Sequence, residues 1–442
     1  MLRRAARSRI ALVASFALFA VPLFTTPVSA QAKPIGQPLK SADFAARVAH
    51  VKALLKTTPL IDSHNDLPWA MRELANAPLD VEAYDLNKPT KGMTDIARLR
   101  KGMVGGQFWS VYIPGEIRDS GYARVQLEQI DVARRTIAKY PKDLKWSLTA
   151  ADVRAAFKSG KIGSLLGMEG GHAIENSLGA LRSYYELGAR YMTLTHNVTL
   201  DWADAALDAP KHGGLTNFGR EVVREMNRLG MLVDLSHVSP SVMSNALDVS
   251  DAPVIFSHSA ARGLTDVARN VPDSILARLP KNGGVVMVTF VPQFTSKAVV
   301  AHAAREGAAR DSIVKAIPKD SVAQMKALAA WREKNPAPRA TIADVADHMD
   351  HVKQIAGATH VGIGGDFDGI TETVIGLEDV SKYPDLLAEL VKRGWTDSEI
   401  RGVAGENILR VLARAEVVAA KLRKERPAST KTIMQLDRKP LP

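Results

Sequence analysis

The sequence predicts a closed parallel (β/α)8 barrel, a TIM-type α/β fold, with extra helices at its N- and C-terminal ends. Short apolar runs rich in Val, Ile and Leu recur along the chain, and longer stretches with helical periodicity separate them. The number of runs favours a closed barrel over an open sheet, because eight strand–helix repeats are typical of a barrel. The runs are residues 60–62, 107–113, 162–168, 191–195, 231–235, 254–257, 284–290 and 360–363.

Apolar residues at helical spacing predict helices between these runs and outside the barrel. An amphipathic stretch at 39–56 precedes the first run, and 397–424 predicts one or two helices after the last. Helices expected between the runs include residues 178–187, 218–229, 240–246 and 342–356. The gap before the eighth run is too long for a plain loop. We therefore expect an insertion at about 295–345, containing a charged helical segment at 311–334.

The first thirty residues have the pattern of an export signal. Residues 1–9 contain four Arg and no acid, residues 10–23 form an apolar run too short to span a bilayer, and Val-Ser-Ala at 28–30 resembles a cleavage site. We expect a signal peptide at 1–30, one barrel domain at 31–425 and a polar tail at 426–442. The mature protein is then periplasmic or secreted, with no membrane anchor.

The composition excludes several classes of protein. With 46% hydrophobic and 24% charged residues among 442, the chain is globular rather than disordered or collagen-like. It contains no Cys, so disulfides and a lipid-modified cysteine are excluded and stability must come from burial or metal. The net charge is +11, and the excess that remains beyond the predicted signal is spread along the chain. It concentrates only near 421–431, where we expect a solvated tail, and no nucleic-acid recognition motif accompanies it.

Potential metal ligands follow six of the eight runs. Barrel enzymes carry their chemistry where the carboxyl ends of the strands meet. A single His beside an apolar run is usually a hydrogen-bonded core residue, but four of the 11 His of this chain fall at the ends of four separate runs. The residues are His64 with Asp66, Glu169, His196, His237, His258 and Asp366.

The spacing of these residues predicts a centre with two metal ions. His64 and Asp66, two residues apart, project to one side of an extended segment and can bind one ion. His237 and His258 come from neighbouring strands and form a second pair, while Glu169 can bridge the two ions. Imidazole and carboxylate ligands suit zinc, so we expect two Zn²⁺ per chain. Two such ions activate a water molecule and polarise a carbonyl group, which predicts a hydrolase.

Two further residues are candidates for catalysis. Asp366, within Gly364-Gly365-Asp366-Phe367-Asp368-Gly369, is the best-placed general base, and we expect Asp368 to be structural. The other predicted ligands suffice for two ions without His196. We therefore expect His196 to stabilise the negative charge that develops on the carbonyl oxygen during the reaction.

Several motifs, in order along residues 60–411, closely resemble the membrane dipeptidase family, the renal-dipeptidase type of zinc peptidases. They include Ile61-Asp62-Ser63-His64-Asn65-Asp66-Leu67-Pro68, Gly167-Met168-Glu169-Gly170-Gly171-His172, Asp234-Leu235-Ser236-His237, Ser257-His258-Ser259, Arg269-Asn270-Val271-Pro272-Asp273 and the Asp366 motif. The resemblance implies a barrel of the metal-dependent hydrolase type, with Glu169 bridging one zinc on His64 and Asp66 and another on His237 and His258.

The resemblance also implies roles and substrates. His196 would hold the scissile carbonyl oxygen, Asp366 would shuttle the proton, and Arg269 would bind the free carboxylate of the substrate, which suits its planar fork. The expected substrates are dipeptides, with a D-residue tolerated at the C-terminal position and some β-lactam rings opened. A homodimer is expected on the same ground. Residues 198–204 and 291–294 differ from the animal enzymes, so side-chain specificity does not transfer.

Two alternatives stay open. One is another binuclear barrel hydrolase, such as a lactonase, a deaminase or an N-acyl amino acid hydrolase. Those enzymes commonly have His-x-His after the first strand and a carboxylated lysine bridge, whereas this chain has His64-x-Asp66 and Glu169. The other is a periplasmic metal or peptide binder without catalysis, which would have lost Asp366 or His196.

Overall fold

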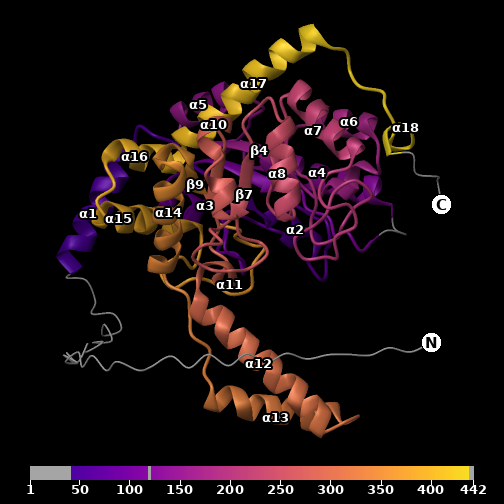
Figure 1. Cartoon of the computed structure of the whole chain (residues 1–442). Coiled ribbons are helices and arrows are strands. Elements are labelled where there is room, and N and C mark those ends of the chain that lie inside the picture. The colour runs from indigo at the N-terminus through magenta and orange to yellow at the C-terminus, as the bar shows by residue number, and fades with distance from the viewer. Residues whose placement is uncertain (1–40, 118–120, 438–442) are drawn as a thin grey trace, which may run out of the picture. The chain divides into compact units, whose positions relative to one another are not determined.

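A computed structural model of the chain describes residues 41–117 and 121–437 (Figure 1). The predicted signal peptide lies outside these residues. The described residues from Ala42 onward belong to one compact unit, which contains the fold described below.

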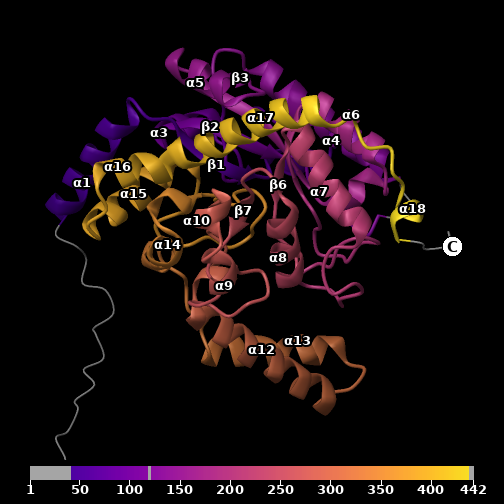
Figure 2. The ribbon, with the colours of Figure 1, turned by 45° about the horizontal axis from the view of Figure 1, so that its top comes forward.

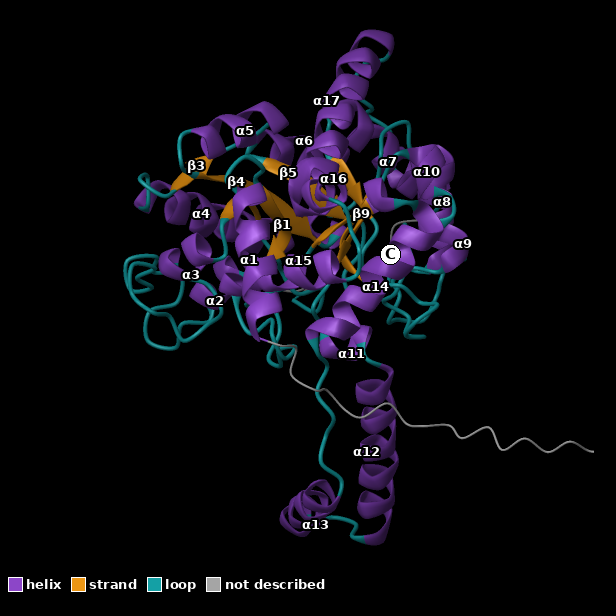
Figure 3. Cartoon of the chain, turned by 90° about the vertical axis from the view of Figure 1, so that its left-hand side faces the viewer, coloured by secondary structure: helices purple, strands orange, loops and turns teal. Residues whose placement is uncertain are grey.

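Eight parallel strands form a closed ring, which confirms the predicted barrel. The first strand pairs with the second and with the last, and the second pairs with the next ring strand, so no edge is left open. Figure 3 shows the strands in the middle, surrounded by helices. The ring strands are β1 (Leu60–Asn65), β2 (Val104–Ser110), β4 (Ile162–Glu169), β5 (Ala189–Thr193), β6 (Leu232–Asp234), β7 (Ile255–Ser259), β8 (Val285–Val288) and β9 (Val361–Ile363).

Two strand predictions need correction. A short extra strand, β3 (Leu144–Trp146), pairs with β4 outside the ring and was not predicted. The second ring strand begins at Val104 rather than at 107, because Gly105 and Gly106 hide its start in the sequence. A Cβ on Gly105 would lie 2.8 Å from Phe157 and Pro59, so this strand packs too closely for a larger residue.

Helices flank the ring strands on the outside. The helices predicted at 178–187, 218–229, 240–246 and 342–356 are present as α6, α7, α8 and α14, and Thr341 with Asp344 forms a capping box at the last of these. The helices are α1 (Ser41–Leu55), α2 (Leu67–Arg72), α3 (Ile96–Lys101), α4 (Tyr122–Lys139), α5 (Ala150–Lys158), α6 (Leu178–Glu186), α7 (Asn217–Leu229), α8 (Pro240–Val249), α9 (Asp273–Leu276), α10 (Leu279–Asn282), α11 (Pro292–Thr295), α12 (Lys297–Ala316), α13 (Ser321–Lys334), α14 (Ile342–Ala356), α15 (Tyr383–Lys392), α16 (Asp397–Arg401), α17 (Asn407–Glu425) and α18 (Ile433–Asp437).

The inside of the barrel is filled with apolar side chains. One buried cluster takes residues from seven ring strands, among them Ile61, Phe108 and Leu165, and joins them to Ile408 and Leu412 of α17. Figure 2 shows α17 running across the strands. In this cluster Leu232, Ile255 and Val285 are the first residues of β6, β7 and β8. Helix α17 therefore covers the N-terminal end of the barrel, and the opposite end is left for the site.

The predicted insertion contains two helices instead of one. The helix expected at 311–334 is interrupted at 317–320, where Pro318 disfavours a helix, Lys319 has φ of 67° and Asp320 caps α13. Helices α12 and α13 lie side by side and project from the barrel (Figures 1 and 3). Among the residues of α12 and α13, only Val299 and His302 are buried.

The C-terminal region has more structure than a polar tail. Helix α18 lies within the predicted tail, and Asp437 accepts a hydrogen bond from the backbone N–H of Asn217 at 2.9 Å, at the start of α7. Among the described residues, no helix combines the length and apolar character needed to cross a membrane.

Candidate metal centre

The carboxyl ends of the ring strands bring the predicted ligands together. His64 lies in β1 and Asp66 follows it, Glu169 ends β4, and His258 lies in β7, while His237 follows β6. Of these five residues, none has more than 7% of its surface exposed. The structure therefore places the five side chains in one buried cluster, although they are separated by up to 194 positions in sequence.

Two buried aspartates hold this cluster in place, and sequence reasoning assigned neither a role. Asp62 accepts hydrogen bonds from Tyr383 Oη at 2.7 Å and from the N–H of Gly365 at 2.8 Å, which ties β1 to the segment after β9. Asp234 accepts from Ser257 Oγ at 2.6 Å and from Thr193 Oγ1 at 2.5 Å, which ties together β5, β6 and β7. In the sequence, each of these aspartates comes shortly before a predicted histidine ligand, Asp62 before His64 and Asp234 before His237, and this spacing could have identified them.

The backbone at two site residues is left-handed. His237 has φ of 66° and Asp366 has φ of 62°, a conformation that costs a non-glycine residue about 1–3 kcal/mol. Strand-end hydrogen bonds hold Asp366 there, since its N–H donates to the carbonyl of His64 and the N–H of Asp66 donates to the carbonyl of Phe367. The folded barrel thus aims these two side chains into the centre.

Side-chain atoms converge at two adjoining points. Around the first, Glu169 Oε1 lies 2.9 Å from His237 Nε2 and 3.2 Å from His258 Nε2. Around the second, His64 Nε2 lies 3.2 Å from Asp66 Oδ2 and 3.5 Å from Glu169 Oε2. Glu169 takes part in both groups with a different oxygen, as a bridging carboxylate would.

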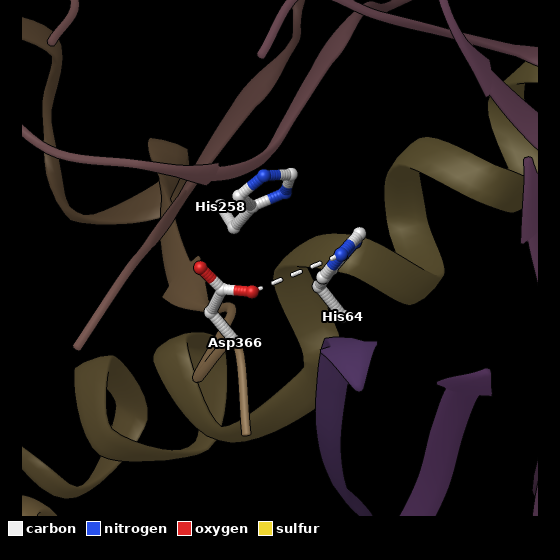
Figure 4. A group of neighbouring side chains, drawn as sticks. All are labelled: His64, His258 and Asp366. Atoms are coloured by element: carbon white, nitrogen blue, oxygen red, sulfur yellow. Dashed lines mark ion pairs between the residues drawn. The ribbon is translucent and has the colours of Figure 1, made fainter. Parts of the chain in front are cut away.

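Asp366 faces both groups. Its Oδ1 lies 3.9 Å from His64 Nε2, and Figure 4 shows His64, His258 and Asp366 turned toward a common space. These three residues form a further potential metal-binding group among the described residues. Asp366 is therefore within reach of either point.

The donor set fits divalent cations. The two groups, His64 with Asp66 and Glu169, and Glu169 with His237 and His258, each place three ligand atoms within 4.8 Å of one another. His64 Nε2 and Asp66 Oδ1 are buried and have no hydrogen-bond partner among the described residues. Buried polar atoms without partners are costly, and a bound cation would satisfy them. Tyr191 Oη lies 2.7 Å from His64 Nδ1 and fixes the ring so that Nε2 faces the centre.

The charge states suit ligand binding at the His237 and His258 side. Burial lowers the pKa of both histidines well below the ordinary value, with Arg269 adding to the effect on His237 and His64 adding to the effect on His258. Burial raises the pKa of Glu169, but His64, His237 and His258 outweigh it and hold that pKa well below its usual range. Neutral imidazole and ionised carboxylate are the forms that bind metals.

His196 and Arg269 also lie at this end. The His196 ring centre is 4.3 Å from that of His237 and 4.8 Å from that of Tyr112, and burial lowers the pKa of His196. Arg269 is 2% exposed, and burial lowers its pKa to about 10, so it remains charged at neutral pH. Its Nε and Nη1 have no partner among the described residues. A buried cation with free donors is a binding site for an anionic group.

A cavity of about 500 Å³ opens onto most of these residues. The predicted residues Asp66, Glu169, His196, His237, His258, Arg269 and Asp366 line it. Sequence reasoning did not single out the side chains that complete its wall, which are Trp69, Glu73, Tyr112, Asn197, Leu207, Ile370 and Thr371. No motif marks them. Trp69 lies in α2 and Glu73 at its end, and the other five lie in irregular segments after the strands. A larger groove of about 910 Å³ over α4 contains none of the predicted site residues.

The known proteins that this chain resembles in sequence or fold include several peptidases. A sequence model described as membrane dipeptidase, peptidase family M19, matches residues 48–426, which include every predicted ligand. One similar solved structure is a probable dipeptidase, PvdM, from Pseudomonas aeruginosa, with 23% identity, coverage of 85% of this chain and 100% of that chain, and a TM-score of 0.73. A second, the M19 metallopeptidase called dipeptidase AC, has 26% identity, coverage of 81% and 99%, and a TM-score of 0.67.

A third similar structure was solved with a ligand. It is a metallopeptidase from Rhodobacter sphaeroides liganded with a phosphinate mimic of the dipeptide L-Ala-D-Ala. Its identity to this chain is 24%, the coverage is 81% of this chain and 99% of that chain, and the TM-score is 0.66.

Proposed function

The chain belongs to the membrane dipeptidase family of metallopeptidases, and from this premise we propose that it is a dizinc enzyme that hydrolyses dipeptides with a free C-terminal carboxylate. The observation that carries the proposal is the cavity itself. It combines two adjoining groups of metal-binding atoms with a buried arginine whose Nε and Nη1 have no partner among the described residues.

The metals would occupy the two groups that share Glu169. His64 and Asp66 complete one group, and His237 and His258 complete the other. Bound zinc would polarise the scissile carbonyl and lower the pKa of the attacking water. The burial of the ligands and the neutral state of His237 and His258 support this assignment.

Three residues of the chain act on the substrate in this proposal. Arg269 pairs through its free Nε and Nη1 with the C-terminal carboxylate and thereby positions the last residue of the peptide. His196, neutral because of its burial, donates a hydrogen bond to the carbonyl oxygen as negative charge develops there. Asp366 accepts the proton of the attacking water and passes it to the leaving amine. Burial raises the pKa of Asp366 well above its ordinary value, with Asp66 and Glu169 adding to the effect against His64, and such a pKa suits a group that carries a proton.

The substrate range we propose includes a D-residue at the C-terminal position. The similar Rhodobacter sphaeroides peptidase was solved with a mimic of L-Ala-D-Ala, which supports this extension. Opening of β-lactam rings is proposed on the family resemblance of the sequence motifs.

We also propose that the enzyme is exported, because residues 1–30 have the pattern of a signal peptide. N-terminal sequencing of the protein from the periplasm tests this proposal, and we expect Gln31 as the first residue.

The function is tested by metal content and initial rate measured together on the purified mature protein. The substrates are Gly-D-Ala, L-Ala-L-Ala and an N-blocked, C-amidated analogue, before and after chelation. We expect about two zinc per chain, cleavage of the free dipeptides only, and loss and recovery of the rate with metal. Bound zinc without dipeptide cleavage would instead direct assays toward lactones and N-acyl amino acids.

Arg269 offers a test of substrate binding. Arg269→Ala should raise KM for L-Ala-L-Ala by about 10–100-fold with a smaller change in kcat, because a charge-assisted bidentate pair is lost. Steady-state kinetics with the dipeptide and its C-terminal amide measure this. An unchanged KM for the free dipeptide would contradict the role of Arg269.

A further inference from the structure

We propose that Glu73, beside Trp69 and Tyr112, binds the free N-terminal ammonium group of the substrate, so that the cavity selects dipeptides that carry charge at both ends. This inference rests on the proposed function and adds to it the recognition of the second end of the substrate.

Among the described residues, five acidic side chains line the cavity, and four of them are engaged. Asp66 and Glu169 belong to the metal-binding groups, and Asp366 faces both groups. Asp368 accepts a hydrogen bond from the backbone N–H of Met93 at 2.6 Å.

Glu73 is the remaining carboxylate. Among the described residues, its side chain has no ion pair or hydrogen bond, and the residue is exposed at the end of α2. Its neighbour Arg72 does not neutralise it, because the Arg72 guanidinium donates to Gln129 Oε1 at 2.6 Å and to Glu128 Oε2 at 2.9 Å on α4. A charge is therefore available at the cavity wall, and none of the described residues uses it.

Two aromatic side chains line the cavity together with Glu73. They are Trp69 and Tyr112, with ring centres 4.9 Å apart and planes at 70°. The guanidinium of Arg72 lies 5.7 Å from the centre of the Trp69 ring, so this ring already attracts one cation. The faces of Trp and Tyr rings attract ammonium groups, and a carboxylate next to them adds a charge-assisted hydrogen bond. Trp69, Tyr112 and Glu73 together, here called the amine wall, have the chemistry of an ammonium site.

The amine wall lies across the mouth of the barrel from Arg269. Tyr112 follows β2, whereas Arg269 follows β7 and donates to the carbonyl of His258 within that strand. In the ring order β1, β2, β4, β5, β6, β7, β8, β9, strands β2 and β7 are diametrically opposite. The metal ligands lie between them. Since two extended residues span at most about 7 Å, a dipeptide held at both ends has its single peptide bond near the middle.

Among linear substrates, the amine wall favours those with a free amino group. A zwitterionic dipeptide satisfies both Arg269 and Glu73, whereas an N-acylated amino acid leaves Glu73 without a partner. Two enzymes with the same kind of metal centre can therefore differ in substrate. One with an amine wall prefers dipeptides, and one without it can act on N-acyl amino acids.

The test compares two ligands that differ only in the ammonium group, L-Ala-L-Ala and propionyl-L-alanine, on zinc-loaded enzyme. The variant is Glu73→Gln, which changes an exposed carboxylate to an amide of the same shape, and its Tm verifies folding. Glu116→Gln is the matched control, because Glu116 is also exposed and its charge reaches Tyr112, yet it does not line the cavity. The measurements are kcat and KM for the dipeptide and Ki for propionyl-L-alanine as a competitive inhibitor.

We expect Glu73→Gln to lower kcat/KM for L-Ala-L-Ala about tenfold, mainly through KM, and to leave Ki for propionyl-L-alanine unchanged. Glu116→Gln should change neither. An equal loss for both ligands, an equal loss with Glu116→Gln, or no loss at all would overturn the inference while leaving the dipeptidase function intact. Failure of the proposed function looks different, because the unaltered enzyme would then cleave propionyl-L-alanine or nothing, and not L-Ala-L-Ala.

Discussion

Asp366 combines three features at the scale of a single residue. It has left-handed backbone geometry, its Oδ1 lies 3.9 Å from His64 Nε2, and its pKa is raised by burial. We predict that Asp366→Asn keeps both metals and lowers kcat by about 10²–10⁴-fold, because an amide cannot accept the proton. Metal analysis by mass spectrometry and the initial rate on L-Ala-L-Ala check this on the same sample.

Asp368→Asn is the comparison for that variant. It makes the same change two residues along the chain, and an Asn Oδ1 can still accept the Met93 N–H that Asp368 accepts at 2.6 Å. Its kcat should stay within about threefold of the original, because no proton transfer depends on it. Loss of metal in Asp366→Asn, or equal losses in the two variants, would contradict the assignment of Asp366.

At the scale of elements, the junction of α16 and α17 depends on a glycine. A π-helical turn at Gly402–Glu406 joins the two helices, and a Cβ on Gly405 would lie 2.2 Å from the carbonyl oxygen of Pro59. We predict that Gly405→Ala lowers the free energy of unfolding by about 1–3 kcal/mol. Thermal unfolding measures the change as a fall in Tm.

Gly307→Ala is the control, because this glycine is also helical, in α12, and a Cβ there would have no atom within 4 Å. It should leave Tm unchanged or slightly higher, since Ala is the better helix former. Equal falls in both variants would mean that the contact with Pro59 is not the cause.

Glu225 connects α7 to two other segments and makes stability depend on pH. It is 2% exposed and pairs with Arg228 in α7 and with Arg182 in α6, and its carboxylate also accepts from the N–H of Ser429. Burial raises the pKa of Glu225, but these three partners outweigh it and lower that pKa below its ordinary 4.5. Its contribution is therefore present above about pH 4.5 and is lost as pH falls through the lowered folded-state pKa.

Glu225→Gln should accordingly lower the free energy of unfolding by about 1–3 kcal/mol near pH 7. The difference from the original protein should shrink below about pH 4.5, where the carboxylate is neutralised. Urea unfolding of the two metal-free proteins at both pH values measures this. A difference that stays constant with pH would show that packing, and not charge, is responsible.

At the scale of the whole molecule, the two ends of the barrel differ. Apolar residues and α17 fill the N-terminal end, whereas the C-terminal end gathers three carboxylates, Asp66, Glu169 and Asp366, around His64. Without a cation these carboxylates repel one another. We predict that chelation lowers Tm and that zinc restores it, with a stabilisation of about 4 kcal/mol at a thousandfold excess over Kd.

Differential scanning fluorimetry with and without chelator checks the effect of metal on Tm. His237→Ala removes one ligand and should weaken the response of Tm to zinc. An enzyme that loses its rate on chelation with no change in Tm would contradict the coupling between metal and fold.

The order of strands and helices was predictable, because the burial of one face of a helix or of a whole strand fixes where apolar residues occur in the sequence. The ring strands are buried on both faces and read as short apolar runs, and α14 was predicted with the bounds it has. The start of β2 was missed because two glycines interrupt its apolar pattern, and the break at Pro318 was missed within a charged segment. The two buried aspartates, Asp62 and Asp234, are part of the motifs. Their role could not be predicted, because the strands that they connect by hydrogen bonds are far apart in sequence.

The sequence by itself determined the barrel, the metal-binding residue types and the family. These follow from the periodic spacing of apolar residues and from short motifs, and both can be recognised without the three-dimensional structure. Tertiary structure alone decided what lies between the motifs. It closed the ring through β1 and β9, turned Glu169 toward both ligand pairs, and left the buried Arg269 with two unpartnered donors among the described residues. It also placed Glu73 and Tyr112 across the barrel mouth from that arginine. The physical reason is that the cavity joins side chains from strand ends, from α2 and from loops, and their relative directions are set only when the ring of strands closes.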